Sequence, residues 1–174
     1  MDTEKLRSLT ILQAEDDPGD VFLLHRAFRL EQVRNPLQTV RDGEEALAYL
    51  TGEGQFADRA RYPLPGLVLL DMKMPKLNGL EVLRRIRPRS GMENLPVAFL
   101  TGAFLAIDVA EAYHLGVHFF IVKPFNFDDL REIVRFLKDW VLHMTPPPTD
   151  QKDWIPLTCR DLEKRWPQWH RRAA

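Results

Sequence analysis

The sequence is poor in the features that mark three large classes of protein. Its 174 residues include one cysteine, Cys159, so neither an intramolecular disulfide framework nor a zinc site built from cysteines can form. No uninterrupted apolar stretch approaches the ~20 residues that cross a membrane. The first ten residues lack the apolar segment of a secretory signal. We therefore expect a cytoplasmic protein that acts without a membrane.

An excess of positive charge is also missing. The formal net charge is −1, whereas domains that bind nucleic acid through its phosphates are usually strongly basic. Residues 1–150 carry 18 Lys and Arg against 22 Asp and Glu, and residues 151–174 carry six against three. The main body is therefore mildly acidic and only the tail is basic, so we expect no nucleic-acid partner.

Short apolar runs alternate with segments of helical periodicity along most of the chain. The runs are Thr10–Ala14, Leu37–Val40, Leu67–Leu70, Val97–Leu100 and His118–Val122. Between them apolar residues recur at helical spacing, most clearly at Leu130, Ile133, Val134, Leu137 and Val141. Strand–helix alternation repeated five times predicts an α/β domain with a parallel sheet. The second run is not apolar throughout, which favours an edge strand.

Two segments interrupt this alternation. Residues 51–65 join a helix to a strand and exceed the ~4–6 residues of a typical connection, so they form either a mobile insertion or a loop that contacts a partner. Pro146, Pro147 and Pro148 end the last helix and begin a polyproline-like linker. The tail beyond them holds Trp154, Trp166 and Trp169, three of the four tryptophans.

Reactive side chains follow four of the five apolar runs. Glu15 and Asp16 follow the first run, Asp71 the third, Thr101 the fourth and Lys123 the fifth. Because the carboxyl ends of parallel strands share one edge of a sheet, we expect these groups to converge. Three crowded carboxylates repel one another, and Mg²⁺, which prefers oxygen ligands, relieves that repulsion. A metal ion, an ammonium and a hydroxyl around Asp71 suit a phosphoryl group on that carboxylate.

Each of these residues also has a plain structural explanation when taken alone. Asp17 before Pro18 is typical of a helix N-cap, and Asp71 or Thr101 could simply end a strand. It is their occurrence at the ends of successive strands, in this order, that favours one joint site.

Five segments resemble, in order and spacing, the receiver domain of bacterial two-component response regulators. They are ILQAEDDPGD, VRDGEEALAYL, LVLLDMKMPKLNGLEVLRRIR, FLTGA and FIVKPF. The resemblance covers residues 8–143 and leaves 144–174 as a Pro-rich linker and a basic, Trp-containing extension. It is strongest to the single-domain regulators associated with bacterial phytochromes. It implies a flavodoxin-like, doubly wound sheet of five parallel strands in the order 2-1-3-4-5.

The resemblance implies a phosphoacceptor and a metal site. Asp71 matches the phosphoacceptor and a metal ligand. Asp16 matches the direct Mg²⁺ ligand, and Glu15 matches the acidic residue that acts through water. The main-chain carbonyl of Lys73 matches a further metal ligand. A smaller polar residue is common at this position, so the Lys73 side chain is expected to change the rate of autodephosphorylation.

The resemblance also implies a conformational switch. Thr101 matches the hydroxyl that moves toward the phosphoryl group, and Lys123 matches the lysine that pairs with it. Phe120 stands where an aromatic switch residue, frequently tyrosine, is expected. Pro124 matches a proline whose preceding peptide bond is often cis.

The implied function is that of a response regulator in a phosphorelay. A sensor histidine kinase, for which a bacterial phytochrome is a candidate, would phosphorylate Asp71. We expect no enzyme activity beyond assisted self-phosphorylation and autodephosphorylation. The roughly 30 residues after the receiver are too few for a DNA-binding module, so output is expected through protein contacts.

Two other functions remain open. A pseudo-receiver would act as an adaptor without phosphorylation, although the intact acceptor, acidic pair and lysine argue against it. A phosphatase of the haloacid-dehalogenase type generally has a second Asp two residues after its nucleophile. Lys73 occupies that position here and cannot serve as the general acid.

The last helix predicts a homodimer. Phe136 and Trp140 are four residues apart on a face beside the inward stripe, and large exposed aromatics usually mark an interface. The alternative is that the Trp-rich tail folds back and covers these two side chains within one chain.

Overall fold

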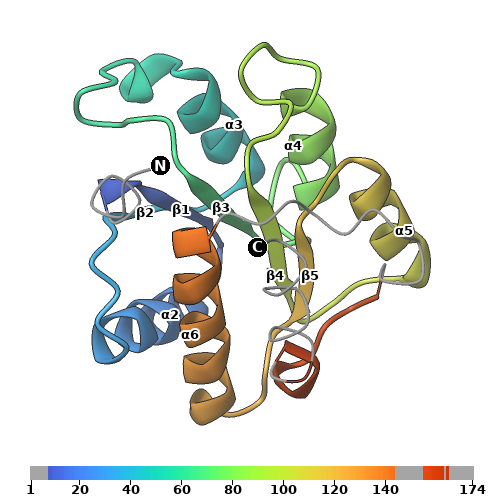
Figure 1. Cartoon of the computed structure of the whole chain (residues 1–174). Coiled ribbons are helices and arrows are strands. Elements are labelled where there is room, and N and C mark those ends of the chain that lie inside the picture. Colours follow the sequence, from blue (N-terminus) through green and yellow to red (C-terminus); the bar gives the residue numbers. More distant parts are fainter. Residues whose placement is uncertain (1–7, 144–154, 163, 165–174) are drawn as a thin grey trace.

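A five-stranded parallel sheet forms the centre of the molecule (Figure 1). The computed structural model describes residues 8–143, 155–162 and 164. The strands are β1 (Ile11–Ala14), β2 (Leu37–Val40), β3 (Leu67–Leu70), β4 (Val97–Thr101) and β5 (Phe119–Val122), in the order β2-β1-β3-β4-β5. The predicted fold class, the strand order and the edge position of the second strand are confirmed.

Helices cover both faces of the sheet (Figure 1). One face carries α2 (Pro18–Leu30) and α6 (Phe127–His143), and the other carries α3 (Gly43–Thr51), α4 (Gly79–Ile86) and α5 (Ala106–His114). Successive residues of a strand point to opposite faces, so Leu12 belongs to the core under α3 and α4 while Ile11 belongs to the core under α2 and α6. In the described residues, no helix is long and apolar enough to span a membrane.

The connection over residues 51–65 is packed onto the domain. A short 3₁₀ turn, η1 (Gly54–Phe56), places the buried ring of Phe56 against Tyr49 and Tyr62, with centroid distances of 5.2 Å to each. Arg59 donates hydrogen bonds to the carbonyl oxygens of Tyr49 and Leu50, at 2.7 and 2.6 Å. These carbonyls belong to the last turn of α3, so the loop caps that helix instead of leaving its carbonyls unsatisfied.

Residues 155–162 lie along the outer edge of β5. Leu157 forms a parallel bridge with Ile121: its N–H donates to the carbonyl of Phe120 at 2.7 Å, and the N–H of Val122 donates to its carbonyl at 2.9 Å. The side chains of Leu157, Cys159 and Leu162 are buried in the core under α2 and α6. The tail thus pairs part of a sheet edge that would otherwise expose free N–H and C=O groups.

Phe136 and Trp140 are buried, so the expectation that they form an exposed dimer surface is wrong. Trp140 is 0% exposed and Phe136 is 6% exposed. Both rings pack edge-on against Phe119 of β5, with centroids 5.1 and 5.0 Å apart. Leu157 and Cys159 belong to the same cluster. Residues 155–162 contribute to the cluster that contains both rings, which favours the alternative of cover within one chain, whereas Trp154, Trp166 and Trp169 lie outside the described residues. A homodimer stays a prediction, but Phe136 and Trp140 offer no exposed surface through which it could form.

The buried tail residue Leu157 should contribute to the stability of the fold. We expect Leu157→Ala to lower the free energy of unfolding by about 2–3 kcal/mol, because a fully buried leucine leaves a cavity, whereas the exposed Arg160→Ala should change it by less than about 0.5 kcal/mol. Urea unfolding measures both.

A chain that ends at Thr145 should also form larger species in sedimentation, because its aromatic core is uncovered. A stable monomer of that length would contradict the covering role.

His118 should make stability depend on pH. It is 7% exposed and its ring lies 5.2 Å from that of Trp140. Burial, together with the charge of Arg87, lowers the pKa of His118 to about 4 from its ordinary 6.5. Above pH 6.5 the imidazole is neutral in both states and its contribution is complete. Between pH 6.5 and 4 the unfolded chain takes up the proton first, so stability falls by up to about 3 kcal/mol.

The variant His118→Phe isolates this contribution. Its free energy of unfolding should fall less than that of the wild type between pH 7.5 and pH 4.5 in urea titrations. Equal losses in the two proteins would mean that other groups cause the acid sensitivity.

Candidate functional site

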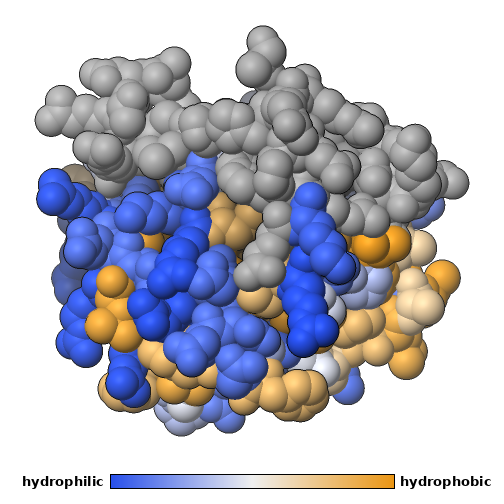
Figure 2. Space-filling model, turned by 60° about the horizontal axis from the view of Figure 1, so that its bottom comes forward, coloured by the Kyte–Doolittle hydropathy of each residue, from blue (hydrophilic) through white to orange (hydrophobic). Residues whose placement is uncertain are grey.

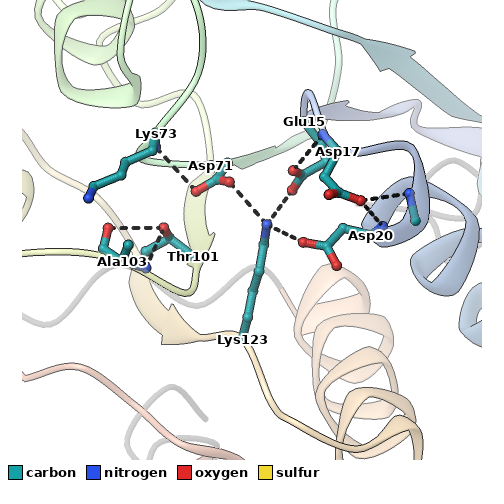
Figure 3. A network of polar contacts seen from close by, with 9 residues as sticks. Glu15, Asp17, Asp20, Asp71, Lys73, Thr101, Ala103 and Lys123 are labelled. Carbon is teal, nitrogen blue, oxygen red and sulfur yellow. Dashed lines mark hydrogen bonds and ion pairs between the residues drawn. The ribbon is translucent and has the colours of Figure 1, made fainter.

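The side chains that were predicted to converge meet at the carboxyl edge of the sheet (Figure 3). Glu15, Asp16 and Asp71 each offer a carboxylate oxygen, and these oxygens lie within 4.8 Å of one another. The ammonium nitrogen of Lys123, Nζ, lies 2.6 Å from Glu15 and 3.0 Å from Asp71. These groups follow β1, β3 and β5, so the parallel strand ends deliver them to one volume.

Asp20 completes the surroundings of Lys123, and the sequence analysis did not identify it. Its carboxylate lies 2.7 Å from Nζ of Lys123 (Figure 3). The sequence indicates only where the helix begins. Asp17 caps α2 and accepts hydrogen bonds from the N–H groups of Gly19 and Asp20, at 2.7 and 3.0 Å. That cap places Asp20 in the first turn, but only the packing of α2 against the sheet turns it toward Lys123.

Burial and crowding shift the titration of this cluster. Burial raises the pKa of Glu15 to about 7, although a hydrogen bond from Lys123 opposes the shift. Burial alone would lower the pKa of Lys123, but its hydrogen bonds to Asp20 and Glu15 and the charge of Asp71 raise it above its ordinary value. Lys123 is therefore a permanent cation, and one ammonium faces several carboxylates.

The donor set fits a hard divalent cation. Such ions take carboxylate oxygens, and Mg²⁺ in particular uses one or two carboxylates and keeps several waters. Asp16 is exposed while Glu15 and Asp71 are buried, so an ion held by all three could keep water on the side of Asp16. The excess of negative charge around Lys123 supplies the electrostatic reason for binding a cation here.

Close backbone contacts hold the loop after Asp71. The N–H of Lys73 donates to Oδ1 of Asp71 at 3.3 Å, and the N–H of Gly79 donates to the carbonyl of Met72 at 2.9 Å. A Cβ atom on Gly79 would collide with the carbonyl oxygen of Asp71, and one on Gly43 would collide with that of Leu77. Both glycines stand in the segments that resemble a receiver domain, and the structure gives a reason for each: only glycine leaves room for the approach.

The two expected switch residues are buried on neighbouring strands. Thr101 ends β4 and is 0% exposed, with its hydroxyl 3.4 Å from both the N–H and the carbonyl oxygen of Ala103. Phe120 on β5 is also fully buried, and its ring packs against Phe99 and Phe104 with centroids 5.4 and 5.0 Å apart. Phe104 follows Thr101 by three residues, so the loop after β4 connects the hydroxyl to the aromatic ring.

Two details differ from simple expectation. The side chain of Lys73 is exposed and points away from the carboxylates (Figure 3), so its ammonium does not contribute to their neutralisation. The peptide bond before Pro124 is trans, and the expectation of a cis bond there is wrong. Lys123 reaches Glu15, Asp20 and Asp71 from the trans backbone.

Comparison with known proteins agrees with this geometry. The family model described as "Response regulator receiver domain" matches residues 11–135. The chain is 32% identical over 138 residues to "Response regulator Rcp1" of Synechocystis sp. (strain ATCC 27184 / PCC 6803 / Kazusa), covering 79% of this chain and 92% of Rcp1. A solved structure of Rcp1 is the Mn²⁺-bound form.

Two further solved structures are similar over most of this chain. The phosphorylated cyanobacterial phytochrome response regulator RcpA is 33% identical with a TM-score of 0.72, covering 82% of this chain and 99% of RcpA. Response regulator RPA3017, in red light signalling of R. palustris, is 36% identical with a TM-score of 0.73 and the same coverage. The homologues of this chain thus include phytochrome-associated, single-domain regulators. The chain belongs to the response regulator receiver domain family.

Proposed function

We propose that this chain is a response regulator in which Asp71 accepts a phosphoryl group from a sensor histidine kinase. The observation that carries the proposal is the position of Asp71: it lies at a strand end, beside the acidic pair Glu15 and Asp16, with the ammonium of Lys123 3.0 Å away. A bacterial phytochrome is the kinase that the similarity to Rcp1 and RcpA favours, and the site of action is then the cytoplasm.

The chemistry at Asp71 is the transfer of one phosphoryl group. A carboxylate oxygen of Asp71 forms a bond to phosphorus as the bond from phosphorus to the donor nitrogen breaks, and the donor imidazole keeps that electron pair. Glu15, Asp16, Asp71 and the main-chain carbonyl of Lys73 would hold Mg²⁺, which supplies positive charge against the phosphoryl oxygens when bound. Self-phosphorylation by small donors and autodephosphorylation belong to the same proposal.

Lys123 has to exchange one partner during this step, the carboxylate oxygen of Asp71, for the phosphoryl group. In the present structure its three N–H donors are directed at Glu15, Asp20 and Asp71. Phosphorylation replaces the charged oxygen of Asp71 with phosphoryl oxygens that carry more negative charge. The ammonium can follow that charge without leaving Glu15 or Asp20, because all three carboxylates already surround it.

Thr101 and Phe120 are suited to report the modification. Among the described residues, the hydroxyl of Thr101 makes only long contacts, 3.4 Å to Ala103, so a phosphoryl oxygen offers it a stronger partner. Movement of Thr101 pulls the loop that carries Phe104, whose ring lies against Phe120. A charge change at Asp71 is thereby converted into repacking at the surface beyond β4 and β5.

Exposed apolar side chains near the site are consistent with output and input through protein contacts. Phe22 and Leu23 on α2 are 63% and 37% exposed, and Phe125, two residues after Lys123, is fully exposed. Figure 2 shows the face that includes the lower end of the molecule in Figure 1, where patches of apolar side chains lie beside hydrophilic ones. Large exposed apolar residues beside a functional edge commonly mark an interaction site.

Asp71 should accept phosphate in vitro. With Mg²⁺ and a small acyl phosphate donor, intact-mass measurement should show one alkali-labile phosphoryl adduct, and chelation of Mg²⁺ should abolish it because the carboxylates lose their compensating charge. Asp71→Asn should remove the adduct, while Asp58→Asn, in the exposed loop after α3, should leave it unchanged. An adduct that survives Asp71→Asn would place the acceptor elsewhere.

Thr101 should matter for the response more than for the transfer. We expect Thr101→Ala to be phosphorylated but to lose about 1 kcal/mol or more of the coupling between Asp71 and the loop at Phe104. Hydrogen exchange of residues 101–105, with and without phosphate, measures that coupling. Thr101→Ser keeps the hydroxyl and should restore it. If the alanine variant responds like the wild type, another group transmits the signal.

A further inference from the structure

The loop between β3 and α4 contains a strained turn. The N–H of Leu77 donates to the carbonyl of Pro75 at 2.8 Å, which closes a three-residue γ-turn with Lys76 at its centre. Lys76 has a φ of 66°, in the left-handed region that residues other than glycine rarely adopt. Among the non-glycine residues that the structure describes, only Gln32 shares a positive φ. Such strain persists where the surrounding structure holds it, and it is most frequent near functional sites.

The first residues of α3 hold this turn. Nζ of Lys76 lies 2.7 Å from Oδ2 of Asp42, the N-cap of α3. The N–H of Gly43 donates to the carbonyl of Pro75 at 3.4 Å. A Cβ atom on Gly43 would lie 2.0 Å from the carbonyl oxygen of Leu77, so the start of the helix and the turn are in direct contact. The beginning of α3 therefore contacts three consecutive residues of the turn.

Asp42 is a well-fixed anchor for Lys76. Its other carboxylate oxygen, Oδ1, accepts a hydrogen bond from the N–H of Glu45 at 2.9 Å, so the helix fixes the orientation of the carboxylate. The side chain of Lys76 is 51% exposed, and an exposed ion pair by itself contributes little to stability. This pair acts together with a hydrogen bond and a packing contact on the same turn. Its effect is therefore expected in the position of the loop rather than in the stability of the fold.

The turn is close in the chain to the atoms that surround the phosphoacceptor. Lys73 precedes Lys76 by three residues, and its N–H donates to Oδ1 of Asp71 at 3.3 Å (Figure 3). Met72 and Met74, on either side of Lys73, are buried. A shift of the turn is therefore passed to the backbone of Lys73 along a short, packed segment that has little room to absorb it.

We propose that Lys76 and Asp42 are positioning residues for the metal site. Their ion pair holds the turn on α3 and thereby fixes the main-chain carbonyl of Lys73 as a ligand. This inference rests on the proposed function, in which that carbonyl helps to hold the ion. The charge of Lys76 makes the role testable by its sign. A cation near a metal site opposes metal binding by Coulomb repulsion, so removing it would raise the affinity, whereas removing a positioning residue lowers it.

Binding of Mn²⁺ to the unphosphorylated full chain tests this role. The EPR signal of the free ion measures the affinity, and competition with Mg²⁺ shows whether the two ions share the site. Lys76→Met should weaken binding about three- to tenfold, which is below the ~10–100-fold typical of residues that hydrogen-bond directly to a metal ligand. Lys76→Arg keeps the cation and should restore the affinity. The control Arg84→Met removes a similarly exposed cation from its ion pair with Glu111, and it should bind Mn²⁺ at least as well as the wild type.

A double-mutant cycle separates the ion pair from the two charges. Asp42→Asn keeps the oxygen that caps α3 and removes the negative charge, and it should weaken binding as Lys76→Met does. The double variant leaves the net charge unchanged and should bind no more weakly than either single variant, because each change removes the same interaction. Hydrogen exchange at the N–H of Leu77, measured without metal, should be faster in all three variants, because the turn opens more often.

The results that would overturn the positioning role are specific. They are an affinity in Lys76→Met equal to or above that of the wild type, additive losses in the double variant, or equal weakening in Arg84→Met. Urea unfolding should give similar midpoints for all variants, and a loss of affinity that only follows a lower midpoint would also overturn it. A wild type that binds no Mn²⁺, or an Asp71→Asn variant that binds it equally well, would overturn the metal site of the proposed function together with this inference. The other results overturn this inference alone.

Discussion

The site depends on the ion pairs that the ammonium group of Lys123 forms with three carboxylates. This group joins Glu15 at the end of β1, Asp20 on α2 and Asp71 at the end of β3, at 2.6, 2.7 and 3.0 Å. Without this cation, three carboxylates from three elements would repel one another at a largely buried edge of the sheet. The same crowding leaves negative charge in excess, so the proposed transfer of a phosphoryl group to Asp71 would need the compensating charge of a metal ion.

Strand β5 connects this site to the rest of the molecule. It ends in Lys123, its inward ring Phe120 contacts the loop after Thr101, and its other face supports Trp140 through Phe119. Its outer edge is paired with Leu157. In the proposed function, a change at Asp71 would therefore reach Phe120, the last helix and the tail through one short strand. In a packed core such a change is transmitted by repacking, because there is little free volume to absorb it.

Family membership and geometry both favour a response regulator over the other two functions that the residues left open. The receiver model spans residues 11–135, and the exposed Lys73 stands where a haloacid-dehalogenase phosphatase needs an acid, pointing away from Asp71 (Figure 3). A pseudo-receiver would not need Glu15, Asp16, Asp71 and Lys123 to converge, yet they do. The tail adds to the surroundings of this site, because Leu157 pairs with the outer edge of the strand that ends in front of Lys123.

The sequence by itself determined the alternating architecture, the five candidate residues at the ends of four strands and the cap at Asp17, because these depend on periodicity and on contacts within a few residues. Tertiary structure alone decided that Asp20 faces Lys123 and that Phe136 and Trp140 are covered. Helical spacing shows that two aromatics share a face, but not what lies against that face. Here Phe119 packs against both rings, and Leu157, in a segment that returns from beyond the last helix, belongs to the same buried cluster.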